Sequence, residues 1–160
     1  MRVVFDTNIF ISAFVIPGGN AEEAYLHAVG GRFELSTSIS ILTENANTLR
    51  TKFAWSEDKV RRVLQAISKI STVLKTHPHL HVLHDDPHNR ILECALFAKA
   101  NMIVTGDYHL LALKRYASVA SIASMASVAS VESIASVASI ASIADIASIE
   151  SIAGGEGKGA

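Results

Sequence analysis

The first 116 residues alternate between short apolar runs and longer amphipathic segments, a pattern typical of strands separated by helices. The predicted strands are RVVFDT (2–7), FELSTS (33–38), HLHVLH (79–84) and NMIVTGD (101–107). Strands that are joined through helices run parallel, and a parallel sheet needs helices on both faces. The hydrophobic pattern therefore predicts an α/β domain with a central parallel sheet.

The clearest predicted helix is SEDKVRRVLQAISKISTVL, residues 56–74. Ser56 is a suitable N-cap, acidic residues occupy the first turn, and the apolar residues recur on one face. That face consists of Val60, Val63, Leu64, Ile67, Ile70 and Leu74.

Capping residues predict where three other helices begin. Asn20 with Glu23 three residues later has the spacing of a capping box. Ser38 or Ser40 is expected to cap the helix that carries ILTENANTL. Pro87 occupies a first-turn position and opens the helix HNRILECALFAKA.

The pattern changes after Tyr116, where a triplet of small residue, serine and branched apolar residue repeats twelve times over residues 117–152. A period of three matches neither a helix nor a strand, so no fixed core-facing stripe forms. We expect a domain over residues 1–116 that lacks its last strand and helix, and a low-complexity tail over residues 117–160. The first repeats, ASVASI, are candidates for a substitute edge strand.

Composition narrows the class of protein. Residues 1–116 carry 13 Lys and Arg against 11 Asp and Glu, and so lack the strong basicity that by itself indicates nucleic-acid binding. The longest uncharged run of the repeat, 16 residues at 116–131, is too short and too serine-rich to span a membrane. Cys94 is the only cysteine and no signal peptide precedes the domain, so we expect a cytoplasmic protein. Cys94 lies in an apolar helix pattern and is expected to be a buried, unreactive thiol.

Two aspartates follow two of the predicted strands. Asp6 comes after VVF and Asp107 after IVTG. In parallel sheets, ligand sites lie beyond the carboxyl ends of the strands, at the point where strand order reverses. If these strands are neighbours, the two carboxylates meet there, and a divalent cation compensates their charge. The alternative is that each aspartate only caps the turn or helix that follows it.

Glu44, on the helix that carries ILTENANTL, is a candidate third oxygen ligand. On its own it would be read as a surface acid. Because Mg²⁺ prefers oxygen ligands, a set of three or four carboxylates predicts Mg²⁺ as the cofactor.

A second possible metal site involves histidines. His77, His79 and His81 alternate and would share one face of the strand predicted at 79–84, and His84 follows closely. A histidine-rich metal-binding module is therefore an alternative function. An exposed polar face is the simpler interpretation, because no cysteine cluster or closed four-ligand spacing accompanies these residues.

The segments VVFDTNIFISAF, NRILECALFAKA and IVTGDYHLL, together with the helix glutamate Glu44, resemble the PIN-domain family, and more narrowly its VapC-like branch of toxins from bacterial toxin–antitoxin systems. The resemblance covers about residues 1–116. It implies a three-layer α/β/α sandwich around a parallel sheet. It also implies metal-dependent endoribonuclease activity.

Carried over residue by residue, the resemblance makes Asp6, Glu44 and Asp107 the catalytic, metal-binding acids. Asn8 and Thr105 match polar positions that we expect to orient the ligands or the attacking water rather than to replace the acids.

One position departs from the family pattern. In DDPHNR, His88 stands directly before the asparagine, where the family typically has its third acid. Three interpretations remain open. Asp86 reaches the metal from the helix N-terminus; or His88 itself is a ligand, which favours Mn²⁺ over Mg²⁺; or the site has lost one acid and binds a single cation weakly. Asp86 is the preferred ligand of the three interpretations, and Asp85 is expected to be solvated.

Other polar residues receive supporting roles. Glu93 is a candidate to support the metal ligands, or else pairs with Arg90 or Lys99. Arg90, Lys114 and Arg115 are candidates for phosphate contact, although such residues more often lie on a solvated face.

The sequence as a whole predicts a Mg²⁺- or Mn²⁺-dependent ribonuclease that cuts single-stranded RNA. The family resemblance implies a cognate antitoxin protein and a homodimer as partners. The alternative is a catalytically degenerate PIN-fold protein, because the triplet repeat begins where the family normally continues with a fifth strand and a closing helix.

Overall fold

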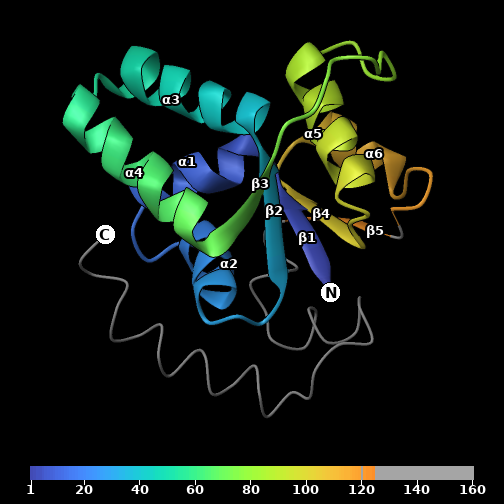
Figure 1. Ribbon diagram of the computed structural model, residues 1–160, viewed down its shortest axis with the longest axis horizontal. Coiled ribbons are helices and arrows are strands. Elements are labelled where there is room, and N and C mark those ends of the chain that lie inside the picture. The colour runs from blue at the N-terminus through green and yellow to red at the C-terminus, as the bar shows by residue number, and fades with distance from the viewer. Residues whose placement is uncertain (120, 125–160) are drawn as a thin grey trace.

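A computed structural model describes residues 1–119 and 121–124 of the chain (Figure 1). Strands and helices alternate along it, as the hydrophobic pattern predicts. In chain order the elements are β1 (Arg2–Phe5), α1 (Thr7–Val15), α2 (Asn20–Val29), β2 (Glu34–Ser38), α3 (Ile39–Phe53), α4 (Glu57–Ile70), β3 (Ser71–Leu74), α5 (Asp86–Phe97), β4 (Met102–Thr105), α6 (Tyr108–Leu113) and β5 (Ser121–Ser124).

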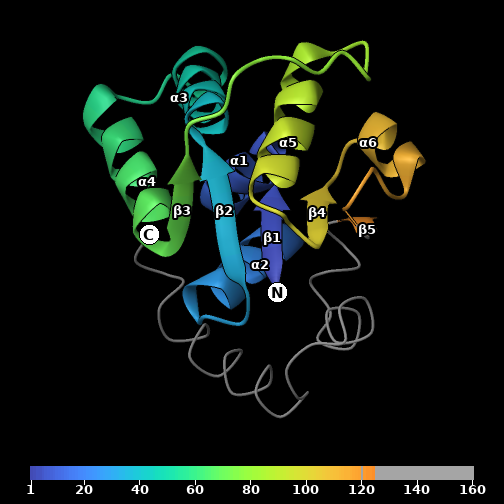
Figure 2. The same ribbon diagram turned by 45° about the vertical axis from the view of Figure 1, so that its right-hand side comes forward.

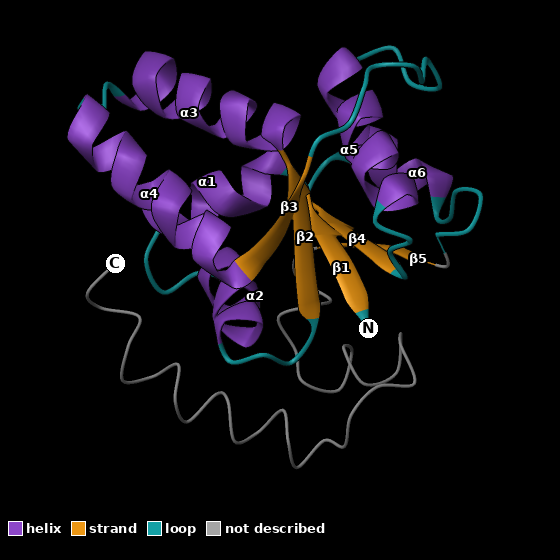
Figure 3. Cartoon of the chain, in the orientation of Figure 1, coloured by secondary structure: helices purple, strands orange, loops and turns teal. Residues whose placement is uncertain are grey.

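The strands form one sheet in the order β3-β2-β1-β4-β5, and every neighbouring pair is parallel. Helices α1 to α4 lie on one side of the sheet, and α5 and α6 lie on the other (Figures 1 and 2). Figure 3 shows the strands as one fan between the two groups of helices. The predicted three-layer α/β/α sandwich with a central parallel sheet is therefore confirmed.

The central strands are buried because helices cover them on both faces. Val3, Val4 and Phe5 of β1 have no exposed surface, and all of β4 is buried. In the core, the ring centroid of Phe5 lies 5.5 Å from that of Phe10 and 5.9 Å from that of Phe33. The amphipathic stripe of α4 faces the same core, where Val60, Val63 and Ile67 are buried.

Two of the predicted helix caps are present. Ser38 Oγ accepts the N–H of Ile41, and Ser56 Oγ accepts that of Lys59. The capping box predicted at Asn20 is wrong. Asn20 is the first residue of α2 and Gly19 is its N-cap. The carboxylate of Glu22 accepts a backbone N–H from the preceding turn, that of Gly18.

The position of the third strand is also a correction. The helix predicted to extend to Leu74 ends at Ile70, and β3 occupies 71–74, paired with β2. The segment predicted as a strand, 79–84, is a loop that leads to α5. Its backbone is hydrogen-bonded to side chains of α5 instead of to a neighbouring strand. These bonds explain why an alternating sequence there does not extend the sheet.

The fifth strand falls within the triplet repeat. Residues Ser121–Ser124 pair in parallel with β4, with Met102 opposite Ser121 and Thr105 opposite Ser124. Just before it, Val119 is buried and forms an isolated antiparallel bridge with Tyr116. The remainder of the predicted tail, residues 125–160, lies outside the described residues. Within residues 1–119 and 121–124, no helix combines the length and the hydropathy that a membrane span requires.

Candidate active site

The reversal of strand order falls between β1 and β4. The chain builds β1, β2 and β3 toward one edge and then places β4 on the opposite side of β1. Phe5, the last residue of β1, pairs with Val104, and the N–H of Asp6 donates to the carbonyl of Val104 at 2.9 Å. The first and fourth predicted strands are thus neighbours, and Asp6 and Asp107 follow them at the same edge.

Thr105 connects the two aspartates. This last residue of β4 is fully buried, and its hydroxyl donates to Asp6 Oδ2 at 2.6 Å. The same hydroxyl oxygen accepts the N–H of Asp107 at 2.9 Å. One side chain therefore fixes both the Asp6 carboxylate and the backbone that carries Asp107.

The two carboxylate oxygens of Asp107 have different partners. Oδ1 caps α6 by accepting the N–H groups of His109 at 2.8 Å and Leu110 at 3.3 Å. Oδ2 lies 3.5 Å from Nε2 of His88. The capping alternative is therefore correct for one oxygen of Asp107, and the other oxygen faces the site.

His88 comes closest to the aspartates from α5. Its ring is buried and lies between two carboxylates. Nε2 faces Asp107, and Nδ1 lies 3.6 Å from Oδ2 of Asp85. Asp86, in contrast, is 73% exposed, and its nearest ion-pair partner is His81 at 4.0 Å. The structure thus brings His88 against Asp107, and leaves Asp86 outside this contact.

Burial determines the electrostatics of Asp6. Its side chain is 3% exposed, and desolvation raises the pKa of its carboxyl above the ordinary value. The Thr105 hydroxyl and the charge of His88 act in the opposite direction, while the nearby Asp107 raises the pKa further. An ionised Asp6 is consequently costly unless a cation compensates it.

Glu44 lines a small pocket of about 160 Å³. Thr7, the residue after Asp6, lines this pocket together with Glu44, Asp86 and Arg90. The structure therefore divides the predicted ligands into two sets, which are linked along the chain where Thr7 follows Asp6. Asp6, Asp107 and His88 form one, and the half-buried Glu44 shares the other with the exposed Asp86.

The structure pairs Glu93 with Arg90. Glu93 is 1% exposed, and Oε1 lies 2.5 Å from Nε of Arg90, which was one of the alternatives expected for this acid. Arg90 also donates to the carbonyl of Leu80 at 2.9 Å. Its guanidinium is thus engaged within the protein, while Lys114 and Arg115, after α6, are exposed, as is the side chain of Asn8.

Sequence reasoning missed Asn89 as a residue that shapes the site. Its fully buried amide accepts the N–H groups of Val82 and Leu83 and donates to the carbonyl of Leu83, all at 2.8–3.0 Å. These bonds hold the loop before α5 against the helix, next to His88. An asparagine within the first turn of a predicted helix was the available signal, because Asn side chains readily hydrogen-bond to nearby backbone groups.

The alternative site at the histidines is not supported. His77, His79 and His81 were expected to share one face of a strand, but they lie in the loop between β3 and α5. The backbone N–H of His79 donates to Oε2 of Glu93 at 2.9 Å, and Nδ1 of His81 lies 4.0 Å from Oδ1 of Asp86. In residues 1–119 and 121–124, no three His, Cys, Asp or Glu side chains converge into a ready-made metal site.

The donors around Asp6 nevertheless fit a divalent cation chemically. Asp6 and Asp107 supply carboxylate oxygens, and His88 supplies an imidazole. Among the described residues, the side-chain hydrogen-bond partner of the buried Asp6 carboxylate is the Thr105 hydroxyl. Two carboxylates and one imidazole suit Mn²⁺ and similar ions as well as Mg²⁺.

Comparison with known proteins agrees with the fold. A family model described as a PIN domain matches residues 2–109. An uncharacterized protein of Methanocaldococcus jannaschii is 30% identical to the chain over 118 residues, which cover 71% of this chain and 76% of that protein. Both Asp6 and Asp107 lie within the matched residues.

Proposed function

Because the chain belongs to the PIN-domain family, which makes it a nuclease by class, we propose that it is a metal-dependent endoribonuclease that hydrolyses phosphodiester bonds in single-stranded RNA. The observation that carries the proposal is the link from Asp6 through the Thr105 hydroxyl to Asp107, at the switch point of the sheet. A buried carboxylate held in that way next to a second one is a poor structural element and a good cation ligand.

In this proposal Asp6, Asp107 and His88 hold the cation, which is Mg²⁺ or Mn²⁺. Glu44 and Asp86 contribute from the adjoining pocket. When bound, a divalent cation neutralises charge on the phosphate and on the carboxylates, and it activates the attacking water.

The chain's own residues do the positioning. Thr105 keeps Asp6 in one orientation by donating to Oδ2. Asp107 is fixed because its other oxygen caps α6. Lys114 and Arg115 follow α6 and are exposed, so they are available to contact phosphates. Arg90 keeps a structural role through Glu93 in this scheme.

The biological role that we propose is that of the toxin of a toxin–antitoxin pair. It is based on the VapC-like character of VVFDTNIFISAF and IVTGDYHLL. The proposed partners are single-stranded RNA, a cognate antitoxin protein and a second copy of the chain.

A cleavage assay tests the nuclease proposal. Single-stranded RNA is incubated with the full chain in Mg²⁺ and, separately, in Mn²⁺, and the Asp6→Asn and Asp107→Asn proteins are compared with the parent. We expect each substitution to lower the cleavage rate by at least about a hundredfold, because each removes a charged metal ligand. Cleavage that survives both substitutions would mean that a different site or a contaminant is responsible.

A catalytically degenerate PIN domain is the second candidate. The observation in its favour is His88, which occupies the position where the family typically has its third acid. If the parent protein does not cut RNA in either metal, while divalent cations still raise its Tm, this second function is supported and the first is not.

A further inference from the structure

The loop between β3 and α5 belongs to an unusual stretch of the chain. Residues 59–84 contain no Asp or Glu, but they contain five Lys or Arg and four His. The chain as a whole has 15 acids for 14 Lys and Arg, so this stretch is a strong local departure from balance. A segment of this kind attracts polyanions.

The cations of this stretch differ in their partners. Arg61 pairs with Asp58 at 3.3 Å, and the ammonium of Lys59 lies 3.8 Å from the ring centroid of Trp55. Lys69 and Lys75 are exposed and form no ion pair within residues 1–119 and 121–124. Lys75 is the first residue after β3, where the loop begins.

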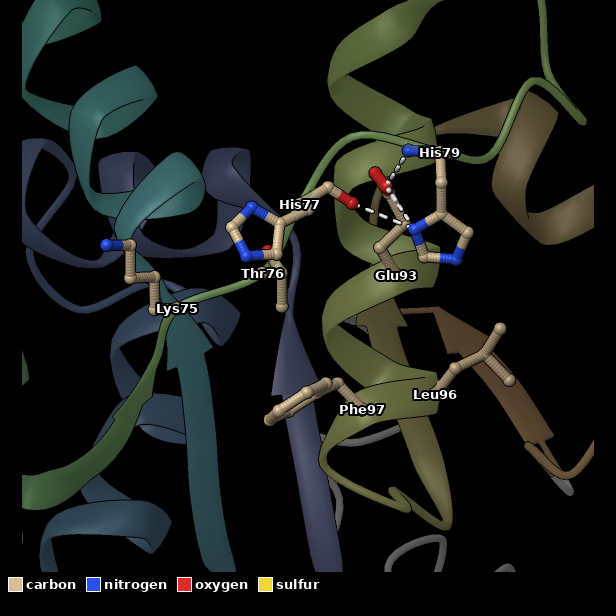
Figure 4. Close-up of a pocket in the computed structure, with 7 residues that line it drawn as sticks. All are labelled: Lys75, Thr76, His77, His79, Glu93, Leu96 and Phe97. Carbon is tan, nitrogen blue, oxygen red and sulfur yellow. Dashed lines mark hydrogen bonds and ion pairs between the residues drawn. The ribbon is translucent and has the colours of Figure 1, made fainter.

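A pocket of about 350 Å³ lies between this loop and α5 (Figure 4). Lys75, Thr76, His77 and His79 line it from the loop, and Glu93, Leu96 and Phe97 line it from α5. In Figure 4 the ring of Phe97 projects from the last turn of α5 toward the strands. Phe97 is 64% exposed, which is high for a large aromatic side chain on a rigid helix.

Hydrogen bonds hold the wall of the pocket in place. Oε2 of Glu93 accepts the backbone N–H of His79 at 2.9 Å and also lies 3.3 Å from Nδ1 of the His79 ring. The same Nδ1 lies 2.8 Å from the backbone carbonyl oxygen of His77 (Figure 4). Arg90 neutralises Glu93 from the opposite direction. The single acid that lines the pocket is therefore already paired, and the remaining charge of the lining is the ammonium of Lys75.

We propose that this pocket is a subsite of the nuclease and binds an unpaired nucleobase of single-stranded RNA. The inference rests on the proposed function. The exposed ring of Phe97 and the imidazole of His77 offer faces on which a base stacks, and Lys75 contacts the adjoining phosphate.

The position of the pocket relative to His88 supports this assignment. Phe97 is nine residues after His88 on α5, so the helix separates the two by about 13.5 Å along its axis. A few nucleotides of an extended strand span that length. Arg90, which lines the pocket beside Glu44, is bonded to Glu93, which lines this one, so the two cavities are joined through one ion pair.

A subsite of this kind selects single-stranded over double-stranded RNA. A base in a duplex is stacked and paired, and its ring faces are not available to an aromatic side chain. Selection through one exposed base needs only a few phosphate contacts, which agrees with a domain whose net charge is close to zero.

The binding experiment uses a fluorescein-labelled oligouridylate, the full chain and fluorescence anisotropy. All proteins carry Asp6→Asn and are measured in EDTA, so that no RNA is cut. The test variant is Lys75→Ala with Phe97→Ala. Its matched control is Lys52→Ala with Phe53→Ala, since these neighbouring residues at the end of α3 are also exposed and lie outside the pocket.

We expect the test variant to bind the RNA at least about fivefold more weakly than the parent, because one stacked base is lost. The slope of log K against log[salt] should also fall by about 0.7, for one phosphate contact to a single strand. The control variant should match the parent in both. A protein with the single substitution Phe97→Tyr keeps the aromatic ring and Lys75. It should therefore bind the RNA with most of the affinity of the parent.

Crosslinking gives an independent measurement. RNA that carries 5-iodouridine is irradiated with the protein, and the attached peptides are identified by mass spectrometry. Adducts on Phe97 or His77 support the subsite, and adducts confined to other regions overturn it.

The outcomes separate the two proposals. If the parent chain cuts and binds RNA while the test and control variants bind equally well, the pocket is not a subsite and the nuclease function stands. If the parent neither cuts nor binds the oligouridylate, both proposals fail. Circular dichroism of each variant shows whether it is folded.

Discussion

Nε2 of His88 lies 3.5 Å from Oδ2 of Asp107, although the two residues belong to α5 and to the turn after β4. The contact joins His88, which departs from the family pattern, to Asp107, which is one of the two aspartates that match the pattern. It gives the substitution at residue 88 a direct physical role, because an imidazole there faces the oxygen that the helix cap leaves free.

Replacing His88 by an acid should change the metal preference. We expect His88→Asp to raise the cleavage rate in Mg²⁺ and to lower the ratio of Mn²⁺ to Mg²⁺ activity by about tenfold, because a carboxylate suits Mg²⁺ better than an imidazole does. His84→Asp, the same change at an exposed position of the preceding loop, should leave the ratio unchanged. An unaltered ratio in the His88→Asp protein would show that residue 88 is not a ligand.

The Thr105 hydroxyl should matter through Asp6. Thr105→Val keeps the shape of the side chain but removes the donor to Asp6 Oδ2, so we expect kcat to fall by about 10–100-fold. Thr37→Val is the matched control. Thr37 lies on β2 and is equally buried, but its hydroxyl has no hydrogen-bond partner in the described residues. Equal kcat values for the two variants would contradict the positioning role.

Asp6 should lower the stability of the metal-free protein at neutral pH. Burial raises the pKa of its carboxyl in the folded state, so the folded protein holds the proton more tightly than the unfolded chain does. Its contribution is therefore favourable below the unfolded pKa, about 3.9, and is lost as the pH rises through the folded value.

Thermal unfolding in EDTA measures this effect. We expect Asp6→Asn to raise Tm by a few degrees at pH 7, and the difference from the parent should shrink as the pH falls toward 4. Mn²⁺ should raise the Tm of the parent but not that of the variant. A lower Tm for Asp6→Asn at pH 7 would contradict the prediction.

Cys94 should be inert in the folded protein. It has no exposed surface, and burial raises the pKa of its thiol to about 12. At pH 8 the thiolate fraction is thus lower by about a thousandfold than in an unfolded chain. Reaction with a disulfide reagent should be slow until denaturant is added, and cleavage activity should survive Cys94→Ala. Rapid labelling of the native chain would contradict burial.

Much of the fold could be predicted because its signals are local. The apolar run of β1 and the apolar stripe of α4 are visible in the hydrophobic pattern. The starts of α3 and α4 are marked by the capping residues Ser38 and Ser56. The error at β3 has a physical reason. Both 71–74 and 79–84 are short segments with strand-like patterns, and only pairing with β2 selects the first. At 79–84, Asn89, Arg90 and Glu93 supply the partners that a strand would have had.

The candidate site divides in the same way. Asp6 and Asp107 were identifiable because each follows a buried strand, and a parallel sheet brings the ends of neighbouring strands together. The choice between His88 and Asp86 was not accessible to sequence reasoning. Both lie in the first turn of α5, and the rotation of that helix against β4 decides which side chain faces Asp107.

The sequence by itself determined the alternation of elements, the placement of acids at strand ends and the family, since these depend on residues close together in the chain. Tertiary structure alone decided the strand order, the bridge through Thr105, the contact of His88 with Asp107 and the pocket beside Phe97. Each of these joins residues that are distant in sequence, and their positions depend on how helices pack across the sheet.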